Sequence, residues 1–233
     1  MSFLETILDF LSFLTAPRPD RSDRKHISIV NMVSLFALIF ISNIVLLGMI
    51  VQVLGIEQLD HKLDDVLLEK GQFFIIMAAV VGAPLMEEFL FRYPLRYHKA
   101  TFFLLSMSVI YIMIESFNLN IHVMLNLIIV LFATGLLTLV VMDRAQEWWK
   151  KVYVRQFPFI FYYIVALFAF LHIYNFDVNT INWYYAPLMV VPQFILGIYL
   201  GYVRLRNNIW SSILIHAINN IIPMILFLTF GSK

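Results

Sequence analysis

Two adjacent glutamates, Glu87 and Glu88, stand inside the otherwise apolar stretch of residues 72–91 (QFFIIMAAVVGAPLMEEFLF). An ionised carboxylate at bilayer depth costs about 2.5 to 3.5 kcal/mol on insertion scales, so two adjacent ones indicate a function. Glu88 and Arg92 are four residues apart with the acid first, which favours an ion pair along a helix. Glu87 then remains as the unpaired carboxylate, suited to act as a general base. The alternative is that both glutamates end a helix and face lipid headgroups.

Two other apolar segments carry polar side chains that could join this chemistry. His172 ends the run Phe168-Ala-Phe-Leu-His172, and His216 and Asn220 lie in His216-Ala-Ile-Asn-Asn220. The four-residue spacing puts His216 and Asn220 on one helix face, about 11 to 17 Å into the membrane when counted from Ile209. Each group alone is explained by packing or by hydrogen bonds between helices. Their occurrence together on three spans favours a shared functional site.

The sequence lacks the motifs that are typical of several other enzymes. There is no HExxH, GxSxG, Walker loop or GxGxxG, and the absence of cysteine excludes thiolate metal sites and cysteine nucleophiles. The net charge of +1, without a basic block, argues against nucleic acid as a partner. Glu115 and His122 flank an expected external turn and are interpreted as solvated.

The composition is typical of an integral membrane protein. Hydrophobic residues make up 61% of the chain and charged residues 13%, against about 25% charged in soluble domains. About seven segments approach the length that a membrane-spanning helix needs. They cover residues 26–56, 72–91, 100–114, 116–142, 156–176, 178–203 and 207–232. We therefore expect an all-α, polytopic bundle of transmembrane helices that forms one domain over residues 1–233.

The termini and loop charges predict how this bundle sits in the membrane. Residues 1–16 are apolar with Glu5 and Asp9 on one face, which predicts an interfacial helix that ends at Pro17. Lysine and arginine concentrate in alternate loops. By the positive-inside rule, this pattern predicts a multi-pass protein of the cell membrane with a cytoplasmic N-terminus and an external C-terminus.

Depth adds a constraint on the second span. His172 lies about 22 Å along its segment from the inner surface, so Glu87 can reach it only if the second span continues past Arg92 toward residues 96–99. Arg92 is then buried and needs a counter-ion. This requirement supports its pairing with Glu88.

These residues form motifs that resemble the CAAX protease and bacteriocin-processing family, also called Abi or CPBP, which includes the type II CAAX prenyl endopeptidases. The family pattern EExxxR, FxxxH and HxxxN is matched here, in order, by Glu87 to Arg92, Phe168 to His172 and His216 to Asn220. The resemblance covers residues 71–223. Two departures are Tyr93-Pro94 where the family commonly has glycine, and a long separation of the first two motifs, which we attribute to an added helical pair within residues 100–155.

The resemblance implies an intramembrane endopeptidase that acts on a peptide or lipidated peptide without a covalent acyl-enzyme. Glu87, helped by His172, would activate a water molecule. His216 and Asn220 would stabilise the oxyanion of the tetrahedral intermediate. Membrane lipids are the other expected partner, and no cofactor is expected.

The same resemblance implies a structural role for the pair of Arg92 and Glu88. Arg92 and Glu88 would hold the helix that carries the base. Zinc bound by Glu87, His172 and His216 is an alternative, since two histidines and a carboxylate form a known zinc set. The metal-independent version is the one we favour.

Two other functions stay open on the sequence alone. A non-catalytic member of the same fold, acting in bacteriocin immunity or as a membrane scaffold, would be indifferent to substitution of Glu87. A small transporter could use the buried acid as a proton relay. That protein would show substrate flux and no cleaved product.

Overall fold

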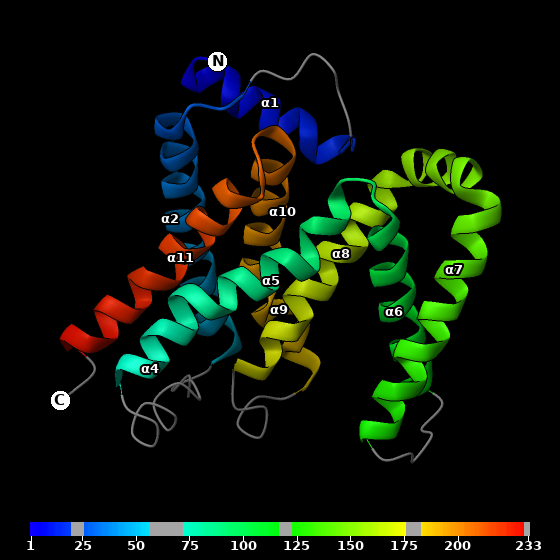
Figure 1. Cartoon of the computed structure of the whole chain (residues 1–233). Helices are drawn as coiled ribbons and strands as arrows, with labels where there is room; N and C mark the ends of the chain where they lie inside the picture. Colours follow the sequence, from blue (N-terminus) through cyan, green and yellow to red (C-terminus); the bar gives the residue numbers. More distant parts are fainter. Residues whose placement is uncertain (20–25, 56–71, 117–122, 176–182, 231–233) are drawn as a thin grey trace.

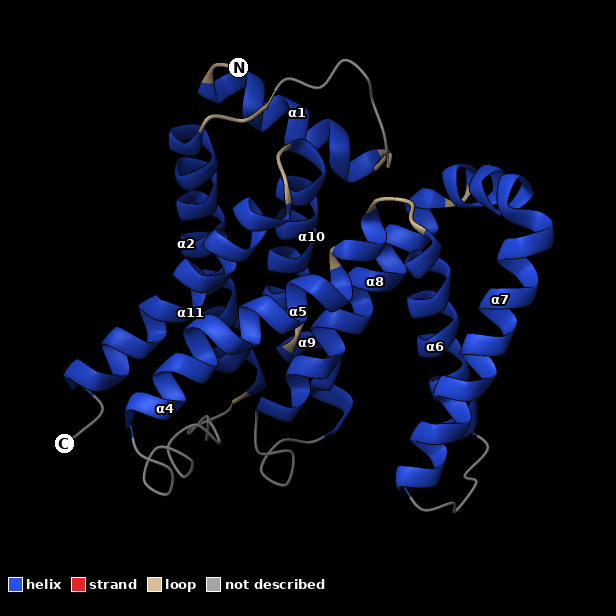
Figure 2. Cartoon of the chain, in the orientation of Figure 1, coloured by secondary structure: helices blue, strands red, loops and turns tan. Residues whose placement is uncertain are grey.

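A computed structural model describes residues 1–19, 26–55, 72–116, 123–175 and 183–230. Within these ranges the chain folds into helices and short turns, with no strand (Figure 2). The longer helices are α1 (Phe3–Thr15), α2 (Ile29–Leu54), α5 (Ala83–Phe91), α6 (Lys99–Ser116), α7 (Val123–Arg155), α8 (Phe157–Leu171), α10 (Val191–Arg206) and α11 (Ile209–Phe230). The short ones are α4 (Gln72–Met77), the π-turn η1 (Ala78–Gly82), α9 (Ala186–Met189) and the 3-10 turns η2 (Tyr93–Leu95), η3 (His172–Asn175) and η4 (Trp183–Tyr185). The all-α prediction is confirmed.

Several helices have the length and composition of membrane spans. Three pass this test in the described part of the chain: Ile29–Leu54, Phe73–Leu95 and Ile209–Leu226. The pair Ile129–Val141 and Ala145–Arg155, bent by 107°, counts as a fourth if it forms one span. Thr101–Tyr111 and Phe157–Leu171 are shorter apolar helices. The membrane fold is therefore confirmed, while the count of about seven spans stays a prediction.

Long-range hydrogen bonds hold the connecting segments together at one end of the bundle. Tyr153 Oη donates to Pro94 O at 2.7 Å, and Arg96 Nη2 donates to Asn207 O at 3.0 Å. Ile27 N donates to Asn207 Oδ1, and Asn207 Nδ2 donates back to Ile27 O, both at 3.0 Å. The ends of α7 and α10, the segment after α5 and the start of α2 therefore meet at this end.

Helix α1 lies across this end, over α2 and α10 (Figure 1). The rings of Phe10 and Phe13 contact Tyr202 of α10, at centroid distances of 5.0 and 5.3 Å. Asp9 fixes the same helix by a bidentate ion pair, with Arg206 Nε 2.6 Å from Oδ2 and Nη2 2.9 Å from Oδ1. A paired guanidinium of this kind tolerates its burial.

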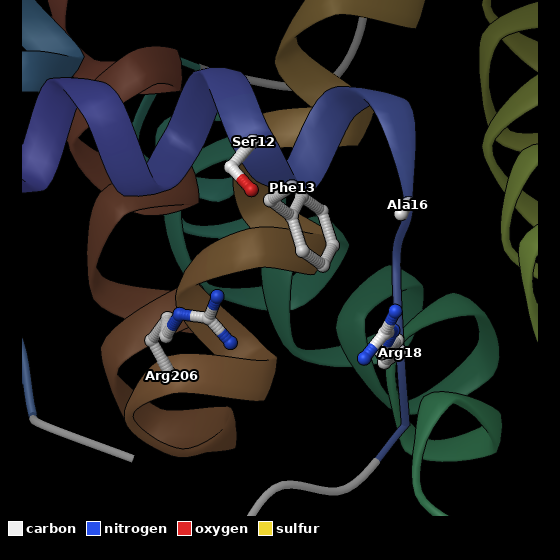
Figure 3. Close-up of a pocket in the computed structure, with 5 residues that line it drawn as sticks. All are labelled: Ser12, Phe13, Ala16, Arg18 and Arg206. Carbon is white, nitrogen blue, oxygen red and sulfur yellow. The ribbon is translucent and has the colours of Figure 1, made fainter. Parts of the chain in front are cut away.

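The two faces of α1 differ in what they contact. A cavity of about 60 Å³ lies between its inner face and α10 (Figure 3). It is lined by Ser12, Phe13, Ala16, Arg18 and Arg206. On the outer face Leu4, Leu8 and Leu11 are exposed. An apolar outer stripe on a helix at the end of a span is what the interfacial prediction requires.

Two glycines let α10 approach α8 closely. An added Cβ at Gly201 would lie 2.6 Å from Phe161 Cε2, and one at Gly197 would lie 3.1 Å from Phe168 Cδ1. The two glycines are four residues apart, so they form the small-residue face by which membrane helices pack. This crossing seats Phe168 against α10 and thereby sets the position of the end of α8.

Helices α6 and α7 form a separate antiparallel pair at the side of the bundle (Figure 1). They fall within the segment where the sequence predicts an added helical pair. Helix α7 is bent where Ala145 departs from helical geometry, with φ −135° and ψ 23°. Near this bend Tyr97 Oη donates to Gln146 O at 3.3 Å, which links the pair to the end of the bundle described above.

Candidate active site

Three elements converge on one cluster of polar side chains. Helix α5 carries Glu87 and Glu88, the end of α8 carries His172, and α11 carries His216 and Asn220. Helices α5 and α11 lie side by side, and α8 packs against both α5 and α10. The residues predicted from three separate motifs are thereby brought together.

Glu88 is fully buried and all its close partners are donors. Arg92 Nε lies 3.4 Å from its Oε1, which is the pairing that the four-residue spacing predicts. His216 Nδ1 lies 2.9 Å from the same oxygen, and the Ser212 hydroxyl donates to Oε2. The three donors satisfy the hydrogen-bonding capacity of this buried carboxylate.

Arg92 is held by an aromatic ring as well as by a carboxylate. Its side chain is 2% exposed, and its Cζ lies 3.9 Å from the centroid of the Phe168 ring. Neither Nη1 nor Nη2 has a hydrogen-bond partner among the described residues. The cation–π contact is therefore a main interaction of the outer part of the guanidinium, and a desolvated contact of this type contributes about 2 kcal/mol or more.

Phe168 also contacts both histidines. Its ring centroid lies 4.5 Å from that of His172 and 5.8 Å from that of His216, the second in an edge-on arrangement. Its backbone carbonyl lies 2.8 Å from His172 Nδ1. One side chain, seated on Gly197, thus touches Arg92 and both imidazoles.

Glu87 faces the two imidazoles without bonding to either. Its Oε2 lies 3.7 Å from His172 Nε2 and 3.7 Å from His216 Nε2. These distances exceed a direct hydrogen bond. The side chain is 29% exposed, and Oε2 has no hydrogen-bond partner in the described part of the chain. An unbonded carboxylate oxygen and two ring nitrogens therefore border the same small space.

The hydrogen bonds at Nδ1 decide what each imidazole offers at Nε2. A carbonyl oxygen only accepts, so His172 Nδ1 must donate to Phe168 O, and the Nε2 of a neutral His172 is an acceptor. His216 Nδ1 donates to the Glu88 carboxylate in the same way. His216 can then donate from Nε2 only as the imidazolium, with Glu88 as its counter-ion.

Asn220 lies one turn beyond His216 and is held at both ends of its amide. Its Nδ2 donates to Ala79 O at 2.9 Å, and its Oδ1 accepts from Asn219 Nδ2 at 3.2 Å. The amide nitrogen carries two hydrogens, so one N–H remains after the bond to Ala79. That donor is what a role in oxyanion binding would use.

The zinc alternative can be compared with this geometry. A catalytic zinc needs three protein ligands, with nitrogen ligands at about 2.0 to 2.1 Å, and an open position for water. No group of three or more His, Cys, Asp or Glu side chains in the described ranges is arranged to hold a metal ion. Glu87, His172 and His216 nevertheless border a common space, with Glu87 Oε2 3.7 Å from each Nε2.

Sequence reasoning missed Ser212, which is buried beside Glu88 and one turn before His216. Its position four residues ahead of His216, on the same face of α11, was the available indication. It also missed the contact between His216 and Glu88, because the spacing of residues within one helix does not predict contacts with another helix.

The family comparison agrees with these motifs. The family model described as "Type II CAAX prenyl endopeptidase Rce1-like" matches residues 69–222, which include every residue of the site. No curated protein and no solved structure gives a significant match.

Proposed function

Because the chain belongs to the Rce1-like family of type II CAAX prenyl endopeptidases, we propose that it hydrolyses a peptide bond of a membrane-associated or lipidated peptide, without a metal ion. The family places the chain among CAAX-type membrane proteases. The substrate, the metal independence and the roles of individual residues are the parts that we propose. The observation that carries the residue roles is the convergence of Glu87 Oε2 and two imidazole Nε2 atoms on one space.

Glu87 and His172 activate the nucleophilic water in this proposal. Both present acceptors, since Glu87 Oε2 is unbonded and His172 Nδ1 uses its hydrogen on Phe168 O. A water molecule with two hydrogens can donate one to each. As its oxygen attacks the substrate carbonyl, Glu87 takes a proton as general base and later returns it to the leaving amine.

His216 and Asn220 stabilise the negative charge on the carbonyl oxygen. His216 donates from Nε2 as an imidazolium, and Asn220 donates its remaining N–H. A single donor of this kind contributes about 3 to 4 kcal/mol to transition-state stabilisation. In this proposal the positive charges of Arg92 and His216 balance the negative charges of the two glutamates.

Phe168 and Arg92 hold the cluster in place. Arg92 pairs with Glu88, and the Phe168 ring packs on the Arg92 guanidinium while it contacts both imidazoles. Catalytic groups must be held close to their working geometry, so these contacts are expected to matter for turnover.

A cleavage experiment tests the function directly. The purified protein is incubated with a peptide that ends in a farnesylated CAAX sequence, with the same peptide lacking the lipid, and with no peptide. We expect a new carboxyl terminus by mass spectrometry on the lipidated peptide, at a higher rate than on the unmodified one. Absence of product from every membrane-associated peptide tried would favour the non-catalytic member of the fold.

We propose that the N-terminus lies in the cytoplasm and the C-terminus outside. Support comes from the end of the bundle where α2 starts and α10 ends, which carries Arg18, Arg96, Arg204 and Arg206 and matches the positive-inside rule. Reporter fusions at each terminus test this orientation. A reporter at the C-terminus that reads as cytoplasmic would contradict it.

A further inference from the structure

The helix that carries Glu87 is interrupted by a π-turn whose hydrogen bonds are shifted by one residue. In α-helical register, Ala79 O would accept from the amide of Ala83, four residues on. In η1 the Ala83 N–H donates instead to Ala78 O, five residues back. The carbonyl of Ala79 thereby loses the partner that an α-helix would supply.

The next residue cannot replace that partner. In π register Ala79 O would accept from residue 84, five residues on. Residue 84 is a proline and has no N–H. Neither register therefore gives Ala79 O a backbone donor, and an unsatisfied carbonyl in a membrane segment is costly.

Asn220 of α11 supplies the missing donor through Nδ2 at 2.9 Å. Since a carbonyl only accepts, the nitrogen of the amide must face Ala79, and Oδ1 must face Asn219 Nδ2, 3.2 Å away. Ala79 O and Asn219 Nδ2 thus occupy two of the four hydrogen-bonding positions of this amide, and the two contacts fix the plane of the group. The free N–H is left in one orientation.

We propose that Pro84 is a positioning residue: with the π-turn it leaves Ala79 O as the acceptor that orients Asn220 for oxyanion binding. This inference rests on the proposed function. It explains why a proline lies three residues before Glu87, at a place where its missing N–H has a consequence for the opposite helix. It also links the helix of the general base to the helix of the oxyanion donor.

Pro84→Ala tests the proposal because stability and activity should move in opposite directions. The new N–H lets the helix return to regular register, so Ala79 O gains a backbone donor and releases Asn220. Removal of a proline from a helix interior raises Tm. We expect a higher Tm, a kcat lower by about tenfold and an unchanged KM. Pro158→Ala, at the first turn of α8 where no helical N–H is missing, is the matched control and should keep kcat.

A second measurement does not depend on activity. Asn220→Ala is introduced into the wild type and into Pro84→Ala, and Tm is compared in a double-mutant cycle. We expect Asn220→Ala to lower Tm clearly in the wild type and much less in Pro84→Ala, where Ala79 O has another donor. Equal losses in both backgrounds, or a Pro84→Ala protein with wild-type kcat, would overturn the positioning role. Coupling in a protein that cleaves no peptide would instead refute the proposed function while it establishes the contact.

Discussion

Glu88 and His216 form a buried hydrogen-bonded pair, with His216 Nδ1 2.9 Å from Glu88 Oε1 and both side chains at most 1% exposed. The same carboxylate receives Arg92 at 3.4 Å. Glu88 therefore contacts both Arg92, which has a structural role, and His216, whose imidazole we propose to be catalytic. From the spacing alone, its predicted partner was Arg92, and its predicted role was to help hold the helix that carries the base. The contact with His216 adds an effect on turnover.

Glu88→Gln should lower both stability and activity. Loss of the carboxylate leaves Arg92 buried without its counter-ion, which typically costs about 3 to 5 kcal/mol. It also removes the counter-charge of the His216 imidazolium, so kcat should fall. Thermal unfolding in detergent and peptide cleavage measure the two effects.

The double substitution Glu88→Gln with Arg92→Met separates these effects. Removing both charges costs far less than removing one, so part of the lost stability should return. Activity should not return, because His216 still lacks its carboxylate. Recovery of kcat together with Tm would show that Glu88 acts only through Arg92.

Phe168→Leu should reduce turnover more than substrate binding. The substitution removes the ring over Arg92 and the contacts with both imidazoles, and a loss of about 1.4 kcal/mol in transition-state stabilisation is tenfold in rate. We expect kcat to fall by about tenfold or more with little change in KM. Phe170→Leu, two residues away on an exposed face (49% exposed), is the control and should be silent.

Gly201→Ala should destabilise the protein although alanine is the better helix former. The added methyl group would lie 2.6 Å from Phe161 Cε2, and overpacking of this kind costs about 1 to 3 kcal/mol. Gly135→Ala in α7 meets nothing within 4 Å and should be neutral or stabilising, by up to about 1 kcal/mol. A similar response of Tm to both substitutions would contradict the close crossing of α8 and α10.

Chelation tests the metal-independent mechanism. The protein is treated with a strong chelator, desalted and assayed for peptide cleavage. We expect full activity, because Glu87 and His172 are both available as acceptors for a water molecule. Loss of activity that returns with one equivalent of zinc per chain would instead support zinc bound by Glu87, His172 and His216.

Local patterns were enough to predict the class of fold and the residues that the structure brings together in the candidate site. Hydrophobic length predicted membrane helices, and the i, i+4 spacing predicted the pairing of Glu88 with Arg92, because both depend on a single helix. The breaks in the helices were less visible. The segment expected as one helix over residues 178–203 is divided in its described part by Val190, between α9 and α10, and α7 bends at Ala145.

The contacts between helices could not be derived in this way. Ser212 meets Glu88 across α11 and α5, and Asn220 meets Ala79 across α11 and the π-turn. Both depend on how two helices are rotated and shifted relative to each other, which the close crossings and the tertiary packing determine. Pro84 inside an apolar helix was the one visible indication that the backbone there is irregular.

The assignment of Glu87 as general base is the central claim, and Glu87→Gln is its most direct test. The amide keeps the shape of the side chain and removes its basicity, so the variant should fold with a wild-type Tm and yield. We expect its cleavage of a farnesylated CAAX peptide to fall below detection, while the peptide still binds. A Glu87→Gln protein that cleaves the peptide at the wild-type rate would show that another group activates the water.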